Sequence, residues 1–210
     1  MTHSEASPNS CKLPGRPRDE AARSRIQKAA IELLIEDGFL NLTCDAIAQR
    51  AGTSKATIYR WWPNKVQVVI DAFIEALSPE LPMSTANTLE DFITLHVRQF
   101  IKAVNGQNGR LLAAILAAAQ VVPEVHEAYL VHWFKPRRDL LRKELLQFQR
   151  SGQLAPEADI DASLDAMFGA LHFVLMVQRN RLKPSYVEQL ARVLLLGLQH
   201  TSKQPSRRAS

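Results

Sequence analysis

Cysteine and glycine are scarce in this chain, and long apolar runs are missing. Of its 210 residues, two are cysteine and eight are glycine. Two cysteines do not suffice for a disulfide framework, so we expect a reducing, cytoplasmic compartment. The longest apolar run, Leu111 to Ala119, is far shorter than the roughly 20 residues that cross a bilayer. The N-terminus has no apolar signal region, and we therefore expect no membrane association.

Signatures of enzyme chemistry are missing as well. The glycines form no phosphate-binding loop, and no nucleophile motif occurs. His126 and His132 are six residues apart, so they do not share a helix face as metal ligands at i and i+4 would. We therefore expect no catalytic residues, no metal site and no cofactor, and give little weight to an α-helical enzyme.

Positive charge is in excess, and it is concentrated in short segments. The net charge is +5, and residues 46–70 contain four cations and no acid: Arg50, Lys55, Arg60 and Lys65. A second group of six cations lies between residues 12 and 28 beside two acids. Clustered cations on short elements indicate phosphate binding, although a solvated surface can have the same composition.

The segment 42–65 has the pattern of a helix-turn-helix. Thr43 is a good N-cap, and Leu42 and Ile47 flank it at the spacing of a hydrophobic staple. Gly52 then provides the left-handed backbone of a sharp turn. Ser54 caps a second helix, which we expect to run from Lys55 to Trp61 or Trp62.

The second helix of this motif has an outer face suited to the major groove. At 100° per residue, Ile58 and Trp62 point one way, while Ala56 and Arg60 point the other. The outer side chains are small, basic and able to form hydrogen bonds. The sequence therefore predicts a helix that reads DNA bases.

This segment resembles the DNA-binding domain of the tetracycline-repressor (TetR) family of bacterial regulators. The matching residues are Thr43, Ala51-Gly52, Ser54 to Tyr59 and Trp62-Pro63-Asn64-Lys65. The close resemblance covers roughly residues 19–77, with Cys44 standing where a branched apolar residue is usual. It implies a homodimer that represses transcription and leaves its DNA when a small molecule binds the C-terminal domain.

We expect the DNA contacts to come from the motif and from a basic arm. The predicted DNA-binding residues are Thr43, Thr53, Ser54, Lys55, Ala56, Thr57, Tyr59, Arg60, Trp61, Lys65, Arg16 and Arg18. Arg60 is assigned to base reading, because a guanidinium pairs bidentately with guanine. Thr43, Tyr59 and Lys65 are assigned to phosphates. Trp61 either meets the DNA backbone or packs under the first helix.

The arm contains Gly15-Arg16-Pro17-Arg18 and resembles an AT-hook core. An extended Arg-Pro-Arg segment can lie in a narrow minor groove, where the potential is most negative. The alternative is a solvated, flexible tail.

The hydrophobic periodicity predicts an all-α fold with two domains. We expect a flexible basic arm over 1–18, a three-helix DNA-binding domain within 19–77, a helical regulatory and dimerisation domain over 78–200, and a disordered tail over 201–210. The first helix is expected at 19–37. The later helices are expected near residues 87–105, 110–121, 124–150, 161–181 and 184–199.

The last two helices are apolar on more than one side, which indicates a second interface. We expect them to form a twofold four-helix bundle with a second copy, and a core helix pair within a monomer is the alternative. The predicted interface residues are Phe168, Leu171, Leu175, Leu190, Leu194 and Leu198.

Polar and aromatic residues within the apolar C-terminal helices are candidates for a ligand pocket. These residues are His96, Gln99, Gln120, His126, Trp133, His172 and Met176. For each of them, a satisfied core or interface side chain is the competing interpretation. The apolar context suggests a hydrophobic or amphipathic effector.

The leading hypothesis is a homodimeric, ligand-responsive repressor that binds a pseudo-palindromic operator in double-stranded DNA. The alternative is a DNA-binding activator or architectural protein without small-molecule input. The sequence does not identify the effector, the operator or the regulated genes.

Overall fold

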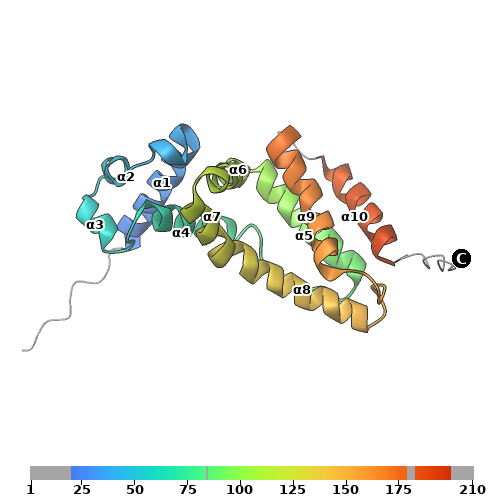
Figure 1. Ribbon diagram of the computed structural model, residues 1–210. Helices are drawn as coiled ribbons and strands as arrows, with labels where there is room; N and C mark the ends of the chain where they lie inside the picture. Colours follow the sequence, from blue (N-terminus) through green and yellow to red (C-terminus); the bar gives the residue numbers. More distant parts are fainter. Residues whose placement is uncertain (1–19, 84, 179–182, 200–210) are drawn as a thin grey trace, which may run out of the picture.

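A computed structural model describes residues 20–83, 85–178 and 183–199 of the chain. Within these ranges the protein is helical and has no strand, which confirms the predicted all-α fold (Figure 1). The predicted arm over 1–18 and the predicted tail over 201–210 lie outside the described residues. The N-terminal helices are α1 (Glu20–Asn41), α2 (Cys44–Ala51), α3 (Lys55–Tyr59) and α4 (Lys65–Leu77).

The C-terminal part consists of the remaining helices, two of which are single π-helical stretches. They are α5 (Leu89–Asn105), α6 (Gln107–Val121), α7 (Pro123–Tyr129), η1 (Leu130–Phe134), α8 (Lys135–Arg150), α9 (Ile160–Phe173), η2 (Val174–Gln178) and α10 (Pro184–Gln199). The stretch from α7 through η1 to α8 is continuous and corresponds to the single helix expected at 124–150.

Side-chain caps set the beginnings of the short N-terminal helices, as predicted. The Thr43 hydroxyl accepts a hydrogen bond from the amide of Ala46 at 3.1 Å, and the Ser54 hydroxyl accepts one from the amide of Thr57 at 3.1 Å. Between them, Gly52 has φ 62° and ψ 43°, a left-handed conformation that costs glycine little. The two hydroxyl groups thus bind backbone amides that the first turn of a helix otherwise leaves without a partner.

Helix α3 ends earlier than predicted, at Tyr59, and Arg60 and Trp61 form a turn. Pro63 disfavours helical backbone at Trp62, so the helix cannot continue through it. Helix α1 extends to Asn41, but Gly38 interrupts it with φ 76° and ψ 166°, which agrees with the predicted end after Asp37.

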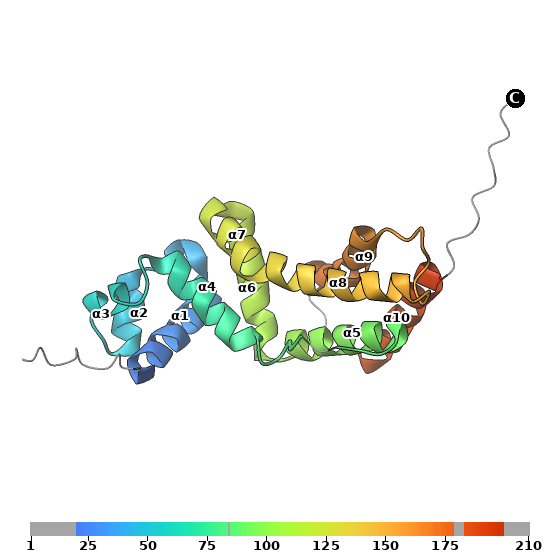
Figure 2. The ribbon, with the colours of Figure 1, turned by 90° about the horizontal axis from the view of Figure 1, so that it is seen from below.

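Helix α4 joins the two parts of the molecule (Figures 1 and 2). It packs against α1 on one side and against α6 and α7 on the other. The Phe73 ring of α4 lies fully buried, with its centroid 5.0 Å from that of Trp133 and 6.0 Å from that of Tyr129. One continuous core therefore extends from the helix-turn-helix into the C-terminal helices.

The C-terminal helices surround a second part of the same core. Helix α5 packs against α6, α9 and α10, and α8 packs against α9. Figure 2 shows α5 and α8 as two long helices on opposite sides of this part. Rings of α5 and α8 meet at Phe92 and Phe148, whose centroids are 5.7 Å apart.

Candidate DNA-reading surface and regulatory cavity

The outer face of α3 is exposed, while its inner face anchors it in the core. Ile58 is completely buried and Trp62 is 5% exposed, whereas Lys55, Ala56 and Arg60 are exposed. This division is the one that the helical spacing predicted. The Tyr59 side chain is also exposed, and Thr53 and Thr57 are half-buried. Most of the predicted contact residues thus lie on one side of a short, firmly anchored helix.

A single carboxylate of α4 fixes the end of this motif against α1. Asp71 Oδ2 accepts hydrogen bonds from Trp62 Nε1 at 2.9 Å, from Arg23 Nη2 at 2.8 Å and from Gln27 Nε2 at 3.1 Å. The three donors come from α1 and from the segment after α3. Asp71 was not predicted from the sequence, because its donors lie 9 to 48 residues away and no local spacing relates them.

Lys55 is paired within the motif. Its Nζ lies 2.9 Å from Asp45 Oδ2 of α2, and both side chains are exposed. The hydrogen bond and the charge of Asp45 raise the pKa of Lys55. Exposed ion pairs of this kind exchange readily, so Lys55 can transfer to a DNA phosphate or base edge.

Lys65 forms its contacts within the protein. Its ammonium donates to the backbone carbonyls of Leu42 at 2.8 Å and Phe39 at 3.1 Å, and it lies 4.5 Å from the centroid of the Phe39 ring. These two hydrogen bonds occupy two of its three donors. The geometry therefore argues against the predicted phosphate contact and assigns Lys65 to fixing the end of α1.

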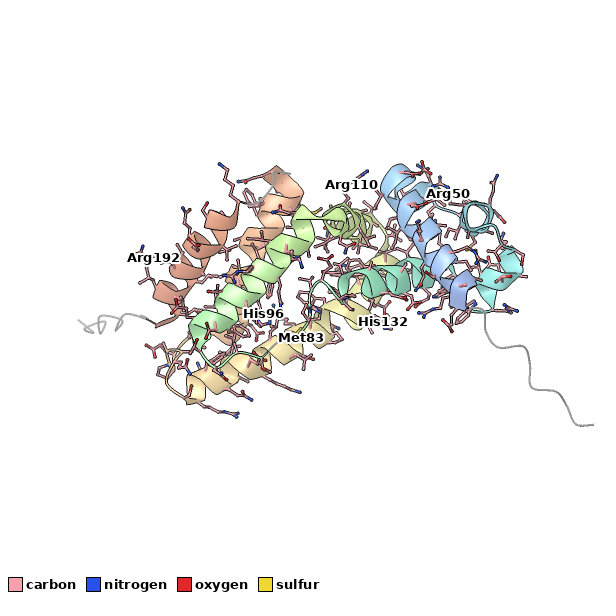
Figure 3. All side chains as sticks on the ribbon, turned by 180° about the vertical axis from the view of Figure 1, so that it is seen from behind. Arg50, Met83, His96, Arg110, His132 and Arg192 are labelled. Carbon is pink, nitrogen blue, oxygen red and sulfur yellow. The ribbon has the colours of Figure 1, made fainter. Side chains whose placement is uncertain are left out.

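Two other residues of the basic segment also have intramolecular partners. Arg50, labelled in Figure 3, pairs with Glu36 at 2.9 Å and with Glu32 at 3.4 Å, so this cation of the sequence cluster braces α2 against α1. The half-buried Trp61 ring packs on Trp62 and under the guanidinium of Arg23, which is 5.7 Å from the ring centroid. This placement agrees with the packing alternative for Trp61. Arg16 and Arg18 lie outside the described residues.

A cavity of about 80 Å³ lies in the C-terminal part, beside the end of α4. Its walls come from α4, α5, α6, α8, α9 and the region of η1. The lining residues are Leu77, Leu81, His96, Gln99, Phe100, Leu112, Tyr129, Trp133, Phe134, Arg137, Arg138, Leu141, Leu164, Phe168 and His172. The surface is mainly apolar, with a few polar groups, as is usual for small-molecule sites.

The structure brings some of the predicted pocket residues together. His96, Gln99, Trp133 and His172 line the cavity. Gln120 and His126 are exposed on α6 and α7, and neither is among the lining residues, so the structure does not place them at this cavity. Met176 is half-buried in η2 and is not among the lining residues.

Two histidines of the cavity are held in the neutral form. His96 Nδ1 lies 2.8 Å from the carbonyl oxygen of Phe92, and His172 Nδ1 lies 2.8 Å from that of Phe168. Burial lowers the pKa of both, and for His96 the nearby charge of Arg137 lowers it further, against the Phe92 hydrogen bond. Because a carbonyl only accepts, Nδ1 must be the donor, and Nε2 of a neutral ring is then an acceptor.

Tyr129 and Arg137 are functional candidates that the sequence prediction missed. With Trp133 they stand at i, i+4 and i+8 along one continuous helix, so they share a face. That spacing is visible in the sequence, and it could have identified them. Figure 3 shows His96 on the inner side of α5, in contrast to Arg192 on the outer side of α10.

The apolar faces of α9 and α10 are divided between the core and the surface. Of the predicted interface residues, Leu171 and Leu194 are buried within the protomer, and Phe168, Leu175, Leu190 and Leu198 are half-buried. The apolar side chains that face outward are Phe173 (53% exposed), Val177 (65%), Val193 (67%) and Leu196 (55%). The spacing of Phe173 and Val177, and of Val193 and Leu196, places each pair on one helix face.

Two further features concern membranes and metals. By length and composition alone, segment 160–178 could cross a membrane, a property that apolar helices of soluble proteins share. Among the described residues, no three His, Cys, Asp or Glu side chains are grouped as metal ligands would be.

Sequence profiles of two related domain families match most of the chain. The family described as bacterial regulatory proteins, tetR family, matches residues 26–72. The family described as Tetracyclin repressor-like, C-terminal domain, matches residues 84–194. The first match ends within α4, and the second begins in the short connection between α4 and α5.

Individual proteins match along nearly their whole length. YdeS of Bacillus subtilis (strain 168), an uncharacterized HTH-type transcriptional regulator, is 34% identical over 189 residues, which are 90% of this chain and 95% of YdeS. The crystal structure of the TetR family transcription regulator SCO0332 is 27% identical, with a TM-score of 0.65 over 84% of this chain and 98% of SCO0332. FadR of Bacillus subtilis in complex with stearoyl-CoA shares the fold at 19% identity, with a TM-score of 0.64 over 83% and 98% of the two chains.

Proposed function

Because this chain belongs to the TetR family of bacterial transcriptional regulators, we propose that it is a homodimeric repressor that a small-molecule effector releases from DNA. It is a DNA-binding regulator and not an enzyme. A cytoplasmic location and a pseudo-palindromic operator are parts of the same proposal. The alternative is an activator or architectural protein without an effector.

The exposed side of α3 supports a specific mode of DNA reading. Arg60 would take a guanine through its two parallel donors, and Ala56 would contact a neighbouring base through its methyl group. The hydroxyl groups of Thr43 and Ser54, which cap α2 and α3, would meet phosphates that approach these helix N-termini. Lys55 would exchange its partner Asp45 for the DNA. Tyr59 would meet the backbone.

The observation that carries the effector part of the proposal is that α4 contacts both sites. Through Asp71 it holds α1 and the segment after α3. At its other end, Leu77 and the following Leu81 line the cavity. A ligand that favours a shifted α4 would change the position of α3, and a coupling of about 1–3 kcal/mol changes DNA affinity roughly 5–150-fold. FadR with stearoyl-CoA is a protein of this fold that binds an acyl ligand.

The outward apolar face of α9 and α10 supports the dimer. We place the interface on Phe173, Val177, Val193 and Leu196, together with the half-buried members of the sequence prediction. A twofold axis would bring the same face of a second copy onto it and form a four-helix bundle. Two copies would then present two α3 helices to successive major grooves, about one turn of DNA apart.

The effector part can be tested with a duplex selected from a random pool. The affinity of the wild-type protein for this duplex is measured with and without each member of a panel of apolar and amphipathic compounds. We expect at least one compound to weaken binding fivefold or more, and Leu164→Phe, which narrows the cavity, to reduce its effect. If no compound changes the affinity, the protein acts without such an effector.

A further inference from the structure

One charged group in the cavity wall has no counter-charge. Arg137 of α8 is half-buried, and none of the ion pairs among the described residues involves it. Its contacts are a hydrogen bond from Nη2 to the carbonyl oxygen of Leu81 at 2.7 Å and the ring of Trp133, 4.5 Å from the guanidinium carbon. A guanidinium has five donors, so these contacts leave most of its hydrogen-bonding capacity unused.

The neighbouring arginine of the same cavity wall, Arg138, is paired with carboxylates. Arg138 Nη1 lies 2.7 Å from Asp165 Oδ1, and Nη2 lies 3.2 Å from Asp161 Oδ1. Two consecutive arginines of α8 therefore border one cavity, and only the first lacks a carboxylate partner in the described part of the chain. Charges that are withdrawn from water are normally paired, so the half-buried guanidinium of Arg137 is suited to a partner from outside the chain.

The side chains nearest to Arg137 do not provide the missing charge. Burial raises the pKa of Tyr129 to about 12, which keeps this phenol neutral. Burial lowers the pKa of His96 and favours its neutral form, and its buried Nε2 has no hydrogen-bond partner in the described part of the chain. Burial also lowers the pKa of Arg137, as expected for a charge without compensation.

We propose that the cavity binds a compact apolar carboxylate, preferably an aromatic one, with its carboxylate on Arg137. The guanidinium has the planar, bidentate geometry that a carboxylate requires. The rings of Phe100, Trp133, Phe134 and Phe168 form an apolar surround for the rest of the ligand. The acceptor Nε2 of His96 favours a ligand that also carries a hydroxyl group.

The cavity volume limits the size of the ligand. An engineered apolar cavity of about 150 Å³ binds benzene, so the cavity of about 80 Å³ favours a small ligand. A single ring with a carboxylate would require its walls to move slightly apart. Long acyl chains would require a much larger movement.

The same guanidinium links the ligand to the DNA-binding part. Arg137 holds the carbonyl of Leu81, four residues after the end of α4. A carboxylate that reorients the guanidinium changes this contact, and with it the support for the end of α4. The inference rests on the proposed regulatory role of the cavity, although ligand binding itself does not require DNA.

The test compares carboxylates with their uncharged amides. The probes are benzoate, 4-hydroxybenzoate, phenylacetate and hexanoate, each paired with its own primary amide, and calorimetry measures their binding to the full-length protein without DNA. We expect at least one aromatic carboxylate to bind tenfold or more tightly than its amide. Arg137→Gln should abolish this preference, while Arg142→Gln, at an exposed position of the same helix outside the cavity wall, should retain it.

Two further measurements keep the outcomes distinct. Circular dichroism tests whether both variants are folded. If Arg137→Gln is unstable, Arg137→Lys replaces it. This variant retains the charge and should keep part of the preference. The proposal is overturned if no carboxylate is preferred over its amide, or if Arg137→Gln keeps the preference. Carboxylate binding that leaves DNA affinity unchanged would instead refute the proposed release mechanism while supporting the site.

Discussion

The two parts of the molecule place their functional side chains in opposite ways. In α2 and α3 the polar groups point outward over a buried anchor, and most of them are exposed. Around the cavity the polar groups point inward from several helices and are surrounded by rings and aliphatic side chains. The first arrangement suits a large, charged ligand such as DNA, and the second suits a small one. Helix α4 contacts both parts. Substitutions that affect one part, or the contact between the two, should therefore reveal its role.

The largest effect is expected from removing the ring that joins the two parts. Phe73→Ala deletes the fully buried side chain of α4 that contacts Tyr129 and Trp133. The change should lower the free energy of unfolding by about 3–5 kcal/mol, through lost burial and the cavity left behind. Chemical denaturation measures it. Tyr59→Ala, which removes an exposed ring from α3, should leave stability nearly unchanged, and equal losses would contradict the proposed importance of this junction.

The next effect concerns self-association. Val193→Glu places a charge on the outward apolar face of α10, where the proposed dimer would bury it. Burying an unpaired charge costs well above the roughly 1.4 kcal/mol that corresponds to a tenfold change, so dimerisation should weaken at least tenfold. Sedimentation velocity over a range of concentrations measures this. Gln189→Glu, at an exposed polar position of the same helix, is the matched control, and an unaffected dimer in Val193→Glu would place the interface elsewhere.

A smaller effect is expected on the pH dependence of stability, through the two histidines of the cavity. The pKa values of His96 and His172 lie below their ordinary value of 6.5 in the folded protein, mainly because of burial. As pH falls below 6.5, the unfolded chain binds protons that the folded protein does not, so stability decreases. The slope is at most about 1.4 kcal/mol per pH unit for each histidine.

Thermal unfolding between pH 5 and 8 measures this slope, and a histidine substitution provides the control. His96→Asn should make the decrease shallower, because one of the two protons no longer contributes. His126→Asn, at an exposed position, should leave the slope unchanged. A slope that persists fully in His96→Asn would show that His96 does not contribute.

The smallest effect is expected on the DNA-reading side. Asp45→Asn removes the exposed partner of Lys55 and should hardly change the thermal midpoint, because surface ion pairs contribute little. It should increase DNA affinity slightly, by no more than a few-fold, since Lys55 no longer leaves an acid to reach the DNA. Fluorescence anisotropy at two salt concentrations measures the change, and weaker binding would show that Asp45 orients Lys55 instead.

The DNA-reading side was predictable because its signals are local. The cap at Thr43, the turn at Gly52 and the cap at Ser54 depend on residues within one turn of each other, and the structure confirms all three. Pro63 could have excluded Trp62 from α3. The roles of Lys65 and Asp71 were not predictable, because their partners are brought together only by the packing of α1 on α4.

The cavity was predictable only in part, because the periodicity of a helix in the sequence does not show which of its faces lines a cavity. His96, Gln99, Trp133 and His172 were found because they interrupt apolar stretches. Gln120 and His126 interrupt them equally and lie at the surface. Arg137 was missed because a cation among the charges of α8 resembles a solvated residue, although its i+4 spacing from Trp133 is visible in the sequence.

The central claim is that the exposed side of α3 reads a twofold DNA site. Selection of bound duplexes from a random pool, with the wild-type protein and Arg60→Ala in parallel, tests it most directly. We predict an enriched inverted repeat with half-sites about one helical turn apart, and relaxed preference at one position of each half-site in the variant. Salt-sensitive binding by the wild type without an enriched sequence would contradict the claim and indicate an architectural protein.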